Sequence, residues 1–215
     1  MEKKISLSGL WNIQGGKSTM EQELEKKLEQ AIWVAHSLFD RNKTNGSSAN
    51  LSFIHNDKIY ISGSGTCFGT LKKTEFSIVD FSGKRYNEVK PSKELPLHKI
   101  FYEKNHKVRA IVHIHSFYSV IFSCLDGENT IPKYTPYLEM KLGKIGVIPY
   151  APPGTEELFA LFAERADEKR GYLLKNHGQL VGGGDIIEAF YGAEELEESA
   201  KVAWYLREKN VSLLP

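Results

Sequence analysis

The sequence predicts an α/β protein in which helices cover both faces of a mixed β-sheet. Long segments with apolar residues at helical spacing stand near both ends of the sequence. Between them, short runs rich in β-branched residues alternate with further helical segments. The alternation favours helices packed on the faces of a sheet, and recurring hairpin patterns require antiparallel pairing within it.

The helices are predicted from apolar periodicity and from residues that cap a helix start. Ser116, Thr155 and Asp185 each precede a helical segment and can offer a side-chain oxygen to the N–H groups of its first turn. The acidic run "EELEES" of the last helix, which includes Glu197, is interpreted as a solvated face without a function. The expected helices occupy residues 20–42, 95–104, 117–124, 155–170 and 185–210.

Strands are predicted where β-branched and aromatic residues lie between turn signals. Residues 51–62 are expected to form two short strands around an Asn-Asp turn, and residues 76–86 a second hairpin. Near the C-terminal end we expect a strand, a tight turn at His177 and Gly178, and another strand. Single strands are expected at residues 110–115 and 144–150.

Length and composition favour one compact domain. With 215 residues, of which 41% are hydrophobic and 26% charged, the chain is long enough for a large core. We expect an N-terminal arm over residues 1–20 and a single domain over residues 21–215. The net charge of +1 favours neither nucleic acid nor an anionic membrane as a partner. Only two cysteines, and no signal-peptide or membrane-length apolar pattern, predict a cytoplasmic location.

The stretch "AIVHIHS" places two histidines inside an apolar run. Side chains at i and i+2 of a strand share a face, so His113 and His115 project together, about 7 Å apart along the strand. Taken alone, the pair also fits hydrogen-bonded sheet residues. His177, at a predicted strand end before Gly178, is the best candidate for a third nitrogen ligand. Three neutral imidazoles would hold a divalent metal and leave a coordination position open for a Lewis-acid role.

Serine- and glycine-rich loops predict an anion site near the metal. Hydroxyl groups donate hydrogen bonds to an anion, and glycines let backbone N–H groups approach it. The hydroxyls belong to Ser47, Ser48, Ser62 and Ser64. Each loop alone is also typical of a hairpin turn. Glu94 precedes a predicted helix, and its spacing alone indicates only a first-turn residue stabilised by the helix dipole.

Five separated motifs carry a family resemblance. The motifs "NGSSANLS", "ISGSGT", "KPSKE", "AIVHIHS" and "KNHG", in this order and spacing, resemble the class II aldolase/adducin family over about residues 21–210. Segments such as "GTCFGTL", "YTPYLEMKLG" and "VIPYAPPGT" are similar to its 3-oxo-tetronate 4-phosphate decarboxylase subgroup. The resemblance implies a three-layer α/β/α fold with a mixed, largely antiparallel central sheet. It also implies a homotetramer with active sites at the subunit interfaces.

The resemblance implies roles for individual residues. The family's zinc-binding histidines match His113, His115 and His177. Its acidic proton donor and acceptor, which can also ligate the metal when substrate is absent, matches Glu94. A tyrosine that reaches the site of a neighbouring subunit matches Tyr137. The family's phosphate pocket matches Ser47, Asn50, Ser64, Gly65, Ser92 and Lys93.

Lys93 and Ala49 depart from the aldolases of the family, which have serine and glycine at these positions. The lysine fits the decarboxylase subgroup and a substrate with two anionic ends. We therefore expect a metal-dependent decarboxylase that converts a 3-oxo-tetronate 4-phosphate into dihydroxyacetone phosphate and carbon dioxide through a zinc-bound enediolate. The expected cofactor is one Zn²⁺ per subunit, although nitrogen ligands also accept Mn²⁺ or Co²⁺.

Two other functions belong to the same family. A sugar-phosphate aldolase or 4-epimerase, similar to fuculose-phosphate aldolase, would use the same zinc site and the same enediolate. Adducin heads resemble this fold and serve as interaction modules without catalysis. The adducin alternative is disfavoured because the three candidate histidines and Glu94 are all present.

Overall fold

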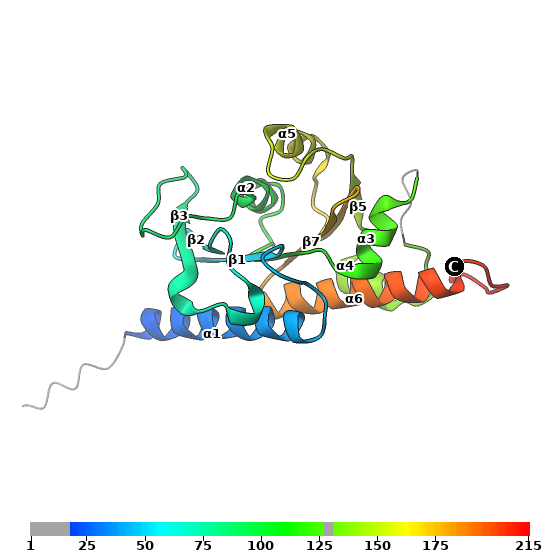
Figure 1. The fold of residues 1–215 in the computed structure, drawn as a ribbon, viewed down its shortest axis with the longest axis horizontal. Coiled ribbons are helices and arrows are strands. Elements are labelled where there is room, and N and C mark those ends of the chain that lie inside the picture. The colour runs from blue at the N-terminus through cyan, green and yellow to red at the C-terminus, as the bar shows by residue number, and fades with distance from the viewer. Residues whose placement is uncertain (1–17, 127–130) are drawn as a thin grey trace, which may run out of the picture.

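Figure 1 shows the computed structural model, which describes residues 18–126 and 131–215. Within these ranges, seven strands form one sheet in the order β3-β2-β1-β4-β7-β6-β5. The strands are β1 (Asn50–His55), β2 (Lys58–Ser62), β3 (Phe76–Asp80), β4 (Ala110–Ile114), β5 (Gly146–Ile148), β6 (Gly171–Leu174) and β7 (Gly178–Gly183). The α-helices are α1 (Thr19–Asp40), α2 (Leu95–Lys104), α3 (Phe117–Cys124), α4 (Tyr137–Leu142), α5 (Glu156–Arg165) and α6 (Ile186–Leu206).

The sheet is mixed and largely antiparallel, as predicted. Strands β5 and β6 pair in parallel, whereas the other neighbours in the described sheet pair antiparallel. The parallel pair is possible because α5 returns the chain to the starting end of the sheet between β5 and β6. The first residue of β1, Asn50, pairs with His113 near the end of β4. The loop before β1 and the loop after β4 therefore meet at one end of the sheet.

Helices cover the two faces of the sheet in separate layers (Figure 1). One apolar cluster packs α1 and α6 against one face and includes Phe190, and the other packs α2 and α5 against the opposite face and includes Phe101. Neighbouring strand residues point to opposite faces, so Val112 of β4 joins the first cluster and Ile111 the second. By the same alternation, His113 projects toward the α2 layer.

The helix caps at Thr155 and Asp185 are confirmed. Thr155 accepts a hydrogen bond from the Leu158 N–H at 3.4 Å, and Asp185 accepts one from the Glu188 N–H at 2.7 Å. Helix α5 ends at Arg165, earlier than predicted, because the chain turns there.

The first helix begins at Thr19 with a capping box in which Ser18 and Glu21 each bond the other's backbone N–H. The predicted N-terminal arm, residues 1–20, lies outside the described residues except for its last three positions. In the described part of the chain, no helix combines the length and apolarity that crossing a bilayer requires.

The cap of α3 differs from the prediction, and so does the role of Glu197. Ser116 occupies the N-cap position but makes no capping hydrogen bond with its side chain. Instead the Glu197 carboxylate of α6 accepts from the Tyr118 N–H at 3.1 Å and from the Ser119 N–H and hydroxyl, each at 2.9 Å. Glu197 is 2% exposed, so the prediction that it lies on a solvated helix face was wrong. An N-terminal helix end attracts a carboxylate, and here a distant helix supplies it.

Two other local predictions were incomplete. The second hairpin consists of β3 and a turn, after which Val79 and Arg85 form one isolated bridge and no second strand forms. The short helix α4 was not predicted, because its few residues are too short for a clear periodic pattern. Packing stabilises α4: Leu142 at its end is buried in the cluster that contains α6.

Replacing Glu197 tests its capping role. In Glu197→Gln, the amide NH₂ must face an N–H donor of α3, so a buried donor loses its acceptor. We expect the free energy of unfolding to fall by about 1–3 kcal/mol. The neighbouring change Glu198→Gln alters only surface ion pairs, with Lys43 and Lys201, and should cost less than about 1 kcal/mol. Urea unfolding of both variants measures the difference, and equal losses would contradict the cap.

Candidate active site

Strands β4 and β7 bring three histidines together at one end of the sheet. His113 lies near the end of β4, His115 follows that strand directly, and His177 lies just before β7, the antiparallel neighbour of β4. The Nε2 atom of His113 lies 3.3 Å from the Nε2 atoms of both His115 and His177. The three histidines named from the sequence are thus close enough to share one ion.

Gly178 permits the close approach of the β6–β7 turn to β4. A Cβ atom at this position would lie 2.7 Å from both the Ile114 carbonyl oxygen and a ring carbon of His115. Position 178 therefore requires glycine because a side chain would collide with β4, and not because the backbone turns sharply there, as we expected. Asn176 takes the left-handed conformation instead, with a φ of 52°.

The histidine arrangement fits a divalent metal. Ligand nitrogens about 2.0–2.1 Å from a tetrahedral ion lie about 3.3 Å from one another, which matches the spacing around His113. His113 Nδ1–H donates to the Gln179 carbonyl oxygen at 2.7 Å, which leaves the Nε2 lone pair facing the other two rings. His177 Nδ1 is buried and has no hydrogen-bond partner among the described residues.

Burial keeps two of the rings neutral, as metal ligands must be. Burial first, and then the neighbouring His113 and His177 rings, lower the pKa of His115 to about 3. Burial and His113 lower the pKa of His177 to about 4. Burial also acts to lower the pKa of His113, but the Glu94 carboxylate outweighs it and raises that pKa.

Glu94 lies against the histidines instead of acting as a helix cap. It occupies the N-cap position of α2, is 3% exposed, and makes no capping hydrogen bond with its side chain. Its Oε2 atom lies 3.2 Å from His113 Nε2 and accepts from Asn50 Nδ2 at 2.9 Å, and Oε1 lies 3.5 Å from His177 Nε2. Burial acts to raise the pKa of Glu94, but the His113 and His177 rings and the Asn50 N–H together hold it well below its usual range. The carboxylate is therefore ionised.

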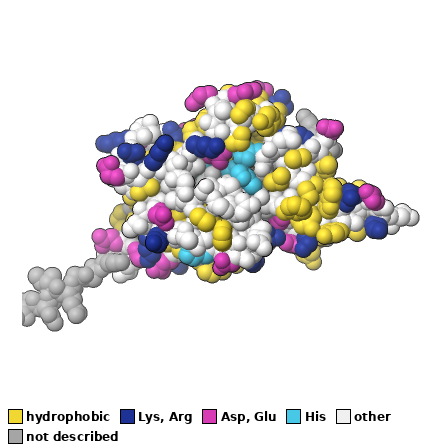
Figure 2. All heavy atoms as spheres, viewed as in Figure 1, with side chains coloured by type: hydrophobic (Ala, Val, Ile, Leu, Met, Phe, Trp, Pro, Cys, Tyr) yellow, Lys and Arg dark blue, Asp and Glu magenta, His cyan; other side chains and the backbone are white. Residues whose placement is uncertain are grey.

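A cavity of about 400 Å³ joins these groups to the serine and glycine loops. Glu94, His115 and His177 line it. All six residues expected to bind phosphate also line it: Ser47, Asn50, Ser64, Gly65, Ser92 and Lys93. Figure 2 shows histidine side chains reaching the surface beside basic and acidic side chains. The candidate metal ligands and the hydroxyl donors thus line one cavity.

Ser62 does not belong to this cavity, contrary to the sequence-based expectation. It ends β2, is completely buried, and its hydroxyl oxygen accepts from the Leu51 N–H at 3.2 Å. Sequence analysis missed Pro153, which lines the cavity and whose carbonyl oxygen accepts from Lys93 Nζ at 3.4 Å. It also missed Gln179, whose carbonyl orients His113. Both contacts join segments far apart in the sequence.

Tyr137 lies apart from the cavity within this chain. It begins α4, is 57% exposed, and is not among the cavity-lining residues. Its role in the site of a neighbouring subunit stays a prediction.

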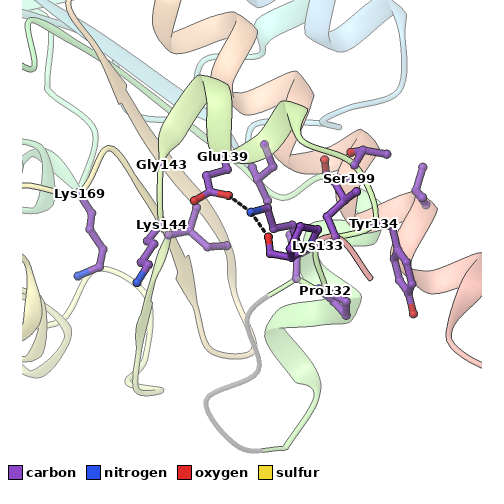
Figure 3. A pocket seen from close by; sticks show the side chains of 15 residues that line it. Pro132, Lys133, Tyr134, Glu139, Gly143, Lys144, Lys169 and Ser199 are labelled. Carbon is purple, nitrogen blue, oxygen red and sulfur yellow. Dashed lines mark hydrogen bonds and ion pairs between the residues drawn. The ribbon is translucent and has the colours of Figure 1, made fainter. Parts of the chain in front are cut away.

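A second, larger cavity of about 570 Å³ lies beside α4 and α6 (Figure 3). Lys133 pairs with Glu139 at its wall and donates to the Pro215 carbonyl oxygen at 2.9 Å. None of the site residues named from the sequence lines this cavity, and its polar side chains include no histidine. Although it is larger, it lacks the chemistry of the smaller cavity.

A family model, curated relatives and a solved structure all relate this chain to class II aldolases. Residues 29–204 match the model of the family described as "Class II Aldolase and Adducin N-terminal domain". The 3-oxo-tetronate 4-phosphate decarboxylase of Haemophilus influenzae is 36% identical over 86% of this chain and 90% of its own length. The L-fuculose phosphate aldolase of Methanococcus vannielii is 36% identical over 81% of this chain and 94% of its own length. The crystal structure of Escherichia coli YgbL superposes with a TM-score of 0.85 at 34% identity, covering 92% of this chain and 96% of that one.

Metal content tests the histidine cluster without reference to activity. The purified protein should carry about one divalent ion per chain. His115→Ala should lower that content well below one because a ring nitrogen is lost, whereas His106→Ala, which removes an exposed histidine, should not change it. Elemental analysis after dialysis against zinc, manganese or cobalt makes the comparison. Wild-type protein that takes up none of the three would contradict a metal site.

Proposed function

The chain belongs to the class II aldolase and adducin family and is a carbon–carbon lyase, and on this premise we propose that it decarboxylates a 3-oxo-tetronate 4-phosphate. The products are dihydroxyacetone phosphate and carbon dioxide. The Haemophilus influenzae decarboxylase, 36% identical to this chain, supports the proposal, whereas the Methanococcus vannielii aldolase, with the same identity, supports an alternative. The charges that line the cavity favour the decarboxylase activity.

One observation carries the proposal: Lys93 lines the same cavity as the histidines and the serine loops. Its ammonium group donates at 3.4 Å to the carbonyl oxygen of Pro153, which lines the cavity too. A 3-oxo-tetronate 4-phosphate carries a carboxylate and a phosphate, whereas fuculose phosphate carries only the phosphate. A cation beside the metal ligands, in addition to neutral hydroxyl donors, suits the substrate with two anionic ends.

The serine and glycine loops bind the phosphate end in this proposal. Ser47, Ser64 and Ser92 contribute hydroxyl donors, and Gly65, with a φ of 79°, turns the backbone beside them. Anchoring the phosphate fixes the reacting carbons relative to Glu94 and the histidines, which lowers the entropic cost of reaction.

Glu94 moves the proton. Loss of carbon dioxide breaks the C1–C2 bond and leaves its electron pair at C2, conjugated with the C3 carbonyl. Protonation at C2 then gives dihydroxyacetone phosphate and consumes one proton, which comes from solvent water. Glu94, ionised before the reaction, is placed to take that proton from a water and pass it to C2 because its Oε1 atom is buried without a hydrogen-bond partner in the described structure. A divalent ion held by the three histidines would stabilise negative charge that develops on the substrate oxygens.

A sugar-phosphate aldolase or 4-epimerase is the second candidate, favoured by the equal identity to the archaeal aldolase. It would use the same histidines, Glu94 and phosphate loops, so Lys93 is the charged group of the cavity that separates the two functions. Zinc as the native metal, the homotetramer with Tyr137 at a shared site, and the cytoplasmic location stay predictions.

Product release decides between the two functions. The metal-loaded protein should release equal amounts of carbon dioxide and dihydroxyacetone phosphate from one stereoisomer of 3-oxo-tetronate 4-phosphate. Lys93→Ser should raise KM for that substrate with little change in kcat, because it removes a contact made equally in the ground and transition states. Its kcat/KM for decarboxylation should therefore fall more than its kcat/KM for any cleavage of fuculose phosphate. Lys90→Ser removes a nearby exposed lysine outside the cavity and serves as the control. Cleavage of fuculose phosphate with no carbon dioxide from either tetronate isomer would favour the aldolase.

Removing the acid of Glu94 tests its role in proton transfer. Glu94→Gln keeps the side-chain size and an oxygen that can accept from Asn50. We expect kcat to fall by about 10²–10⁴-fold, with melting temperature and metal content close to wild type. Glu103→Gln changes an exposed glutamate of the same helix and should leave kcat unaltered. Near-normal turnover in Glu94→Gln would exclude Glu94 as the proton-transfer group.

A further inference from the structure

A chain of buried polar side chains extends behind Glu94, away from the cavity. Glu94, His98 and Tyr102 are four residues apart and therefore share one face of α2. Asn50 and Ser52 are two residues apart on β1 and share the face of the sheet that α2 covers. Side chains of α2 and β1 contact each other in turn, so that each hydrogen bond joins the helix to the strand.

The contacts run without a gap from the carboxylate to the phenol. Asn50 Nδ2 lies 2.9 Å from Glu94 Oε2, and Asn50 Oδ1 lies 2.6 Å from His98 Nε2. Ser52 Oγ lies 2.7 Å from His98 Nδ1 and 2.6 Å from the Tyr102 hydroxyl. All five side chains are buried, so each polar group depends on this chain for its partner.

The direction of every hydrogen bond follows from Glu94. The Asn50 NH₂ group donates to Glu94 Oε2 at 2.9 Å, so the amide oxygen faces His98. His98 must then donate from Nε2. Burial, first, and then the His113 ring lower the pKa of His98 to about 3, so the ring is neutral and its Nδ1 atom must accept. The Ser52 hydroxyl therefore donates to Nδ1, and its oxygen accepts from Tyr102.

The opposite direction would reverse the amide. If His98 carried its proton on Nδ1, its Nε2 atom would accept from the Asn50 NH₂ group. The amide oxygen would then face Glu94, and two acceptors would meet across the 2.9 Å contact. Donation from the Ser52 hydroxyl matches the tautomer that the Asn50 amide requires, and it gives the buried Nδ1 lone pair of His98 its donor.

We propose that Ser52 and His98 are positioning residues that hold the Asn50 amide with its N–H toward Glu94 and so keep the carboxylate aimed at the histidine cluster. They act through Asn50 and touch no substrate. Their effect on turnover rests on the proposed function, whereas the tautomer of His98 does not.

Turnover of the Ser52 variants tests the positioning role. Ser52→Ala frees His98 to change tautomer, and we expect kcat to fall by about 10–100-fold, the range typical of residues that orient a functional group. KM should stay within about two-fold, because the phosphate loops are untouched. Ser52→Thr keeps the hydroxyl and should recover most of kcat. The matched control is Ser77→Ala, since Ser77 is also a fully buried strand serine but its hydroxyl has no partner among the described residues.

A kcat for Ser52→Ala equal to that of Ser77→Ala would overturn the proposal, and so would a rise in KM with kcat unchanged. The assay uses whichever sugar-phosphate substrate wild-type protein turns over.

The tautomer is read directly by ¹⁵N NMR of protein labelled at its seven histidines, with His98→Gln identifying the His98 signals. We expect wild-type His98 to show a protonated Nε2 and an unprotonated Nδ1 atom, and Ser52→Ala to lose that preference. A wild-type ring protonated at Nδ1 would overturn the proposal even if the enzyme is active. The expected tautomer in a protein that turns over neither substrate would support the network while contradicting the proposed function.

Discussion

The carboxylate of Glu94 lies buried among imidazole rings, and the surrounding structure is arranged to keep it charged. A carboxylate removed from water is costly unless it is paired and hydrogen bonded. His113 and His177 lie within 3.5 Å of its oxygens, and Asn50 donates to it. The ionised state suits the proposed role of Glu94, which takes a proton from water and passes it on, so the contacts that make burial tolerable also favour that role.

The order of the central strands explains why these groups meet. Strands β1, β4 and β7 are neighbours, and the start of β1, the end of β4 and the start of β7 lie at one end of the sheet. Each supplies a polar residue there: Asn50, His113 and His177. Helix α2 packs on the same face and adds Glu94 from its first turn, together with His98 one turn later.

Lys93 and Glu94 are adjacent in sequence but serve different parts of the cavity. The Lys93 stem crosses Gly154, and its ammonium group donates to the Pro153 carbonyl, whereas Glu94 turns inward to the histidines. Both residues lie in the turn that leads into α2, which the Leu95 N–H closes by donating to the Ser92 carbonyl oxygen at 3.1 Å. One short segment thus carries both the cation and the carboxylate to which we assign substrate binding and proton transfer.

The sequence by itself determined the elements whose signals are local. Apolar periodicity and caps such as Thr155 and Asp185 placed the longer helices, and the pair at His113 and His115 indicated one face of one strand. Local patterns record which residues are apolar and where the chain turns, but hydrogen-bond partners distant in the sequence are chosen by packing. Only the tertiary structure therefore decided that Glu197 caps α3 from another helix.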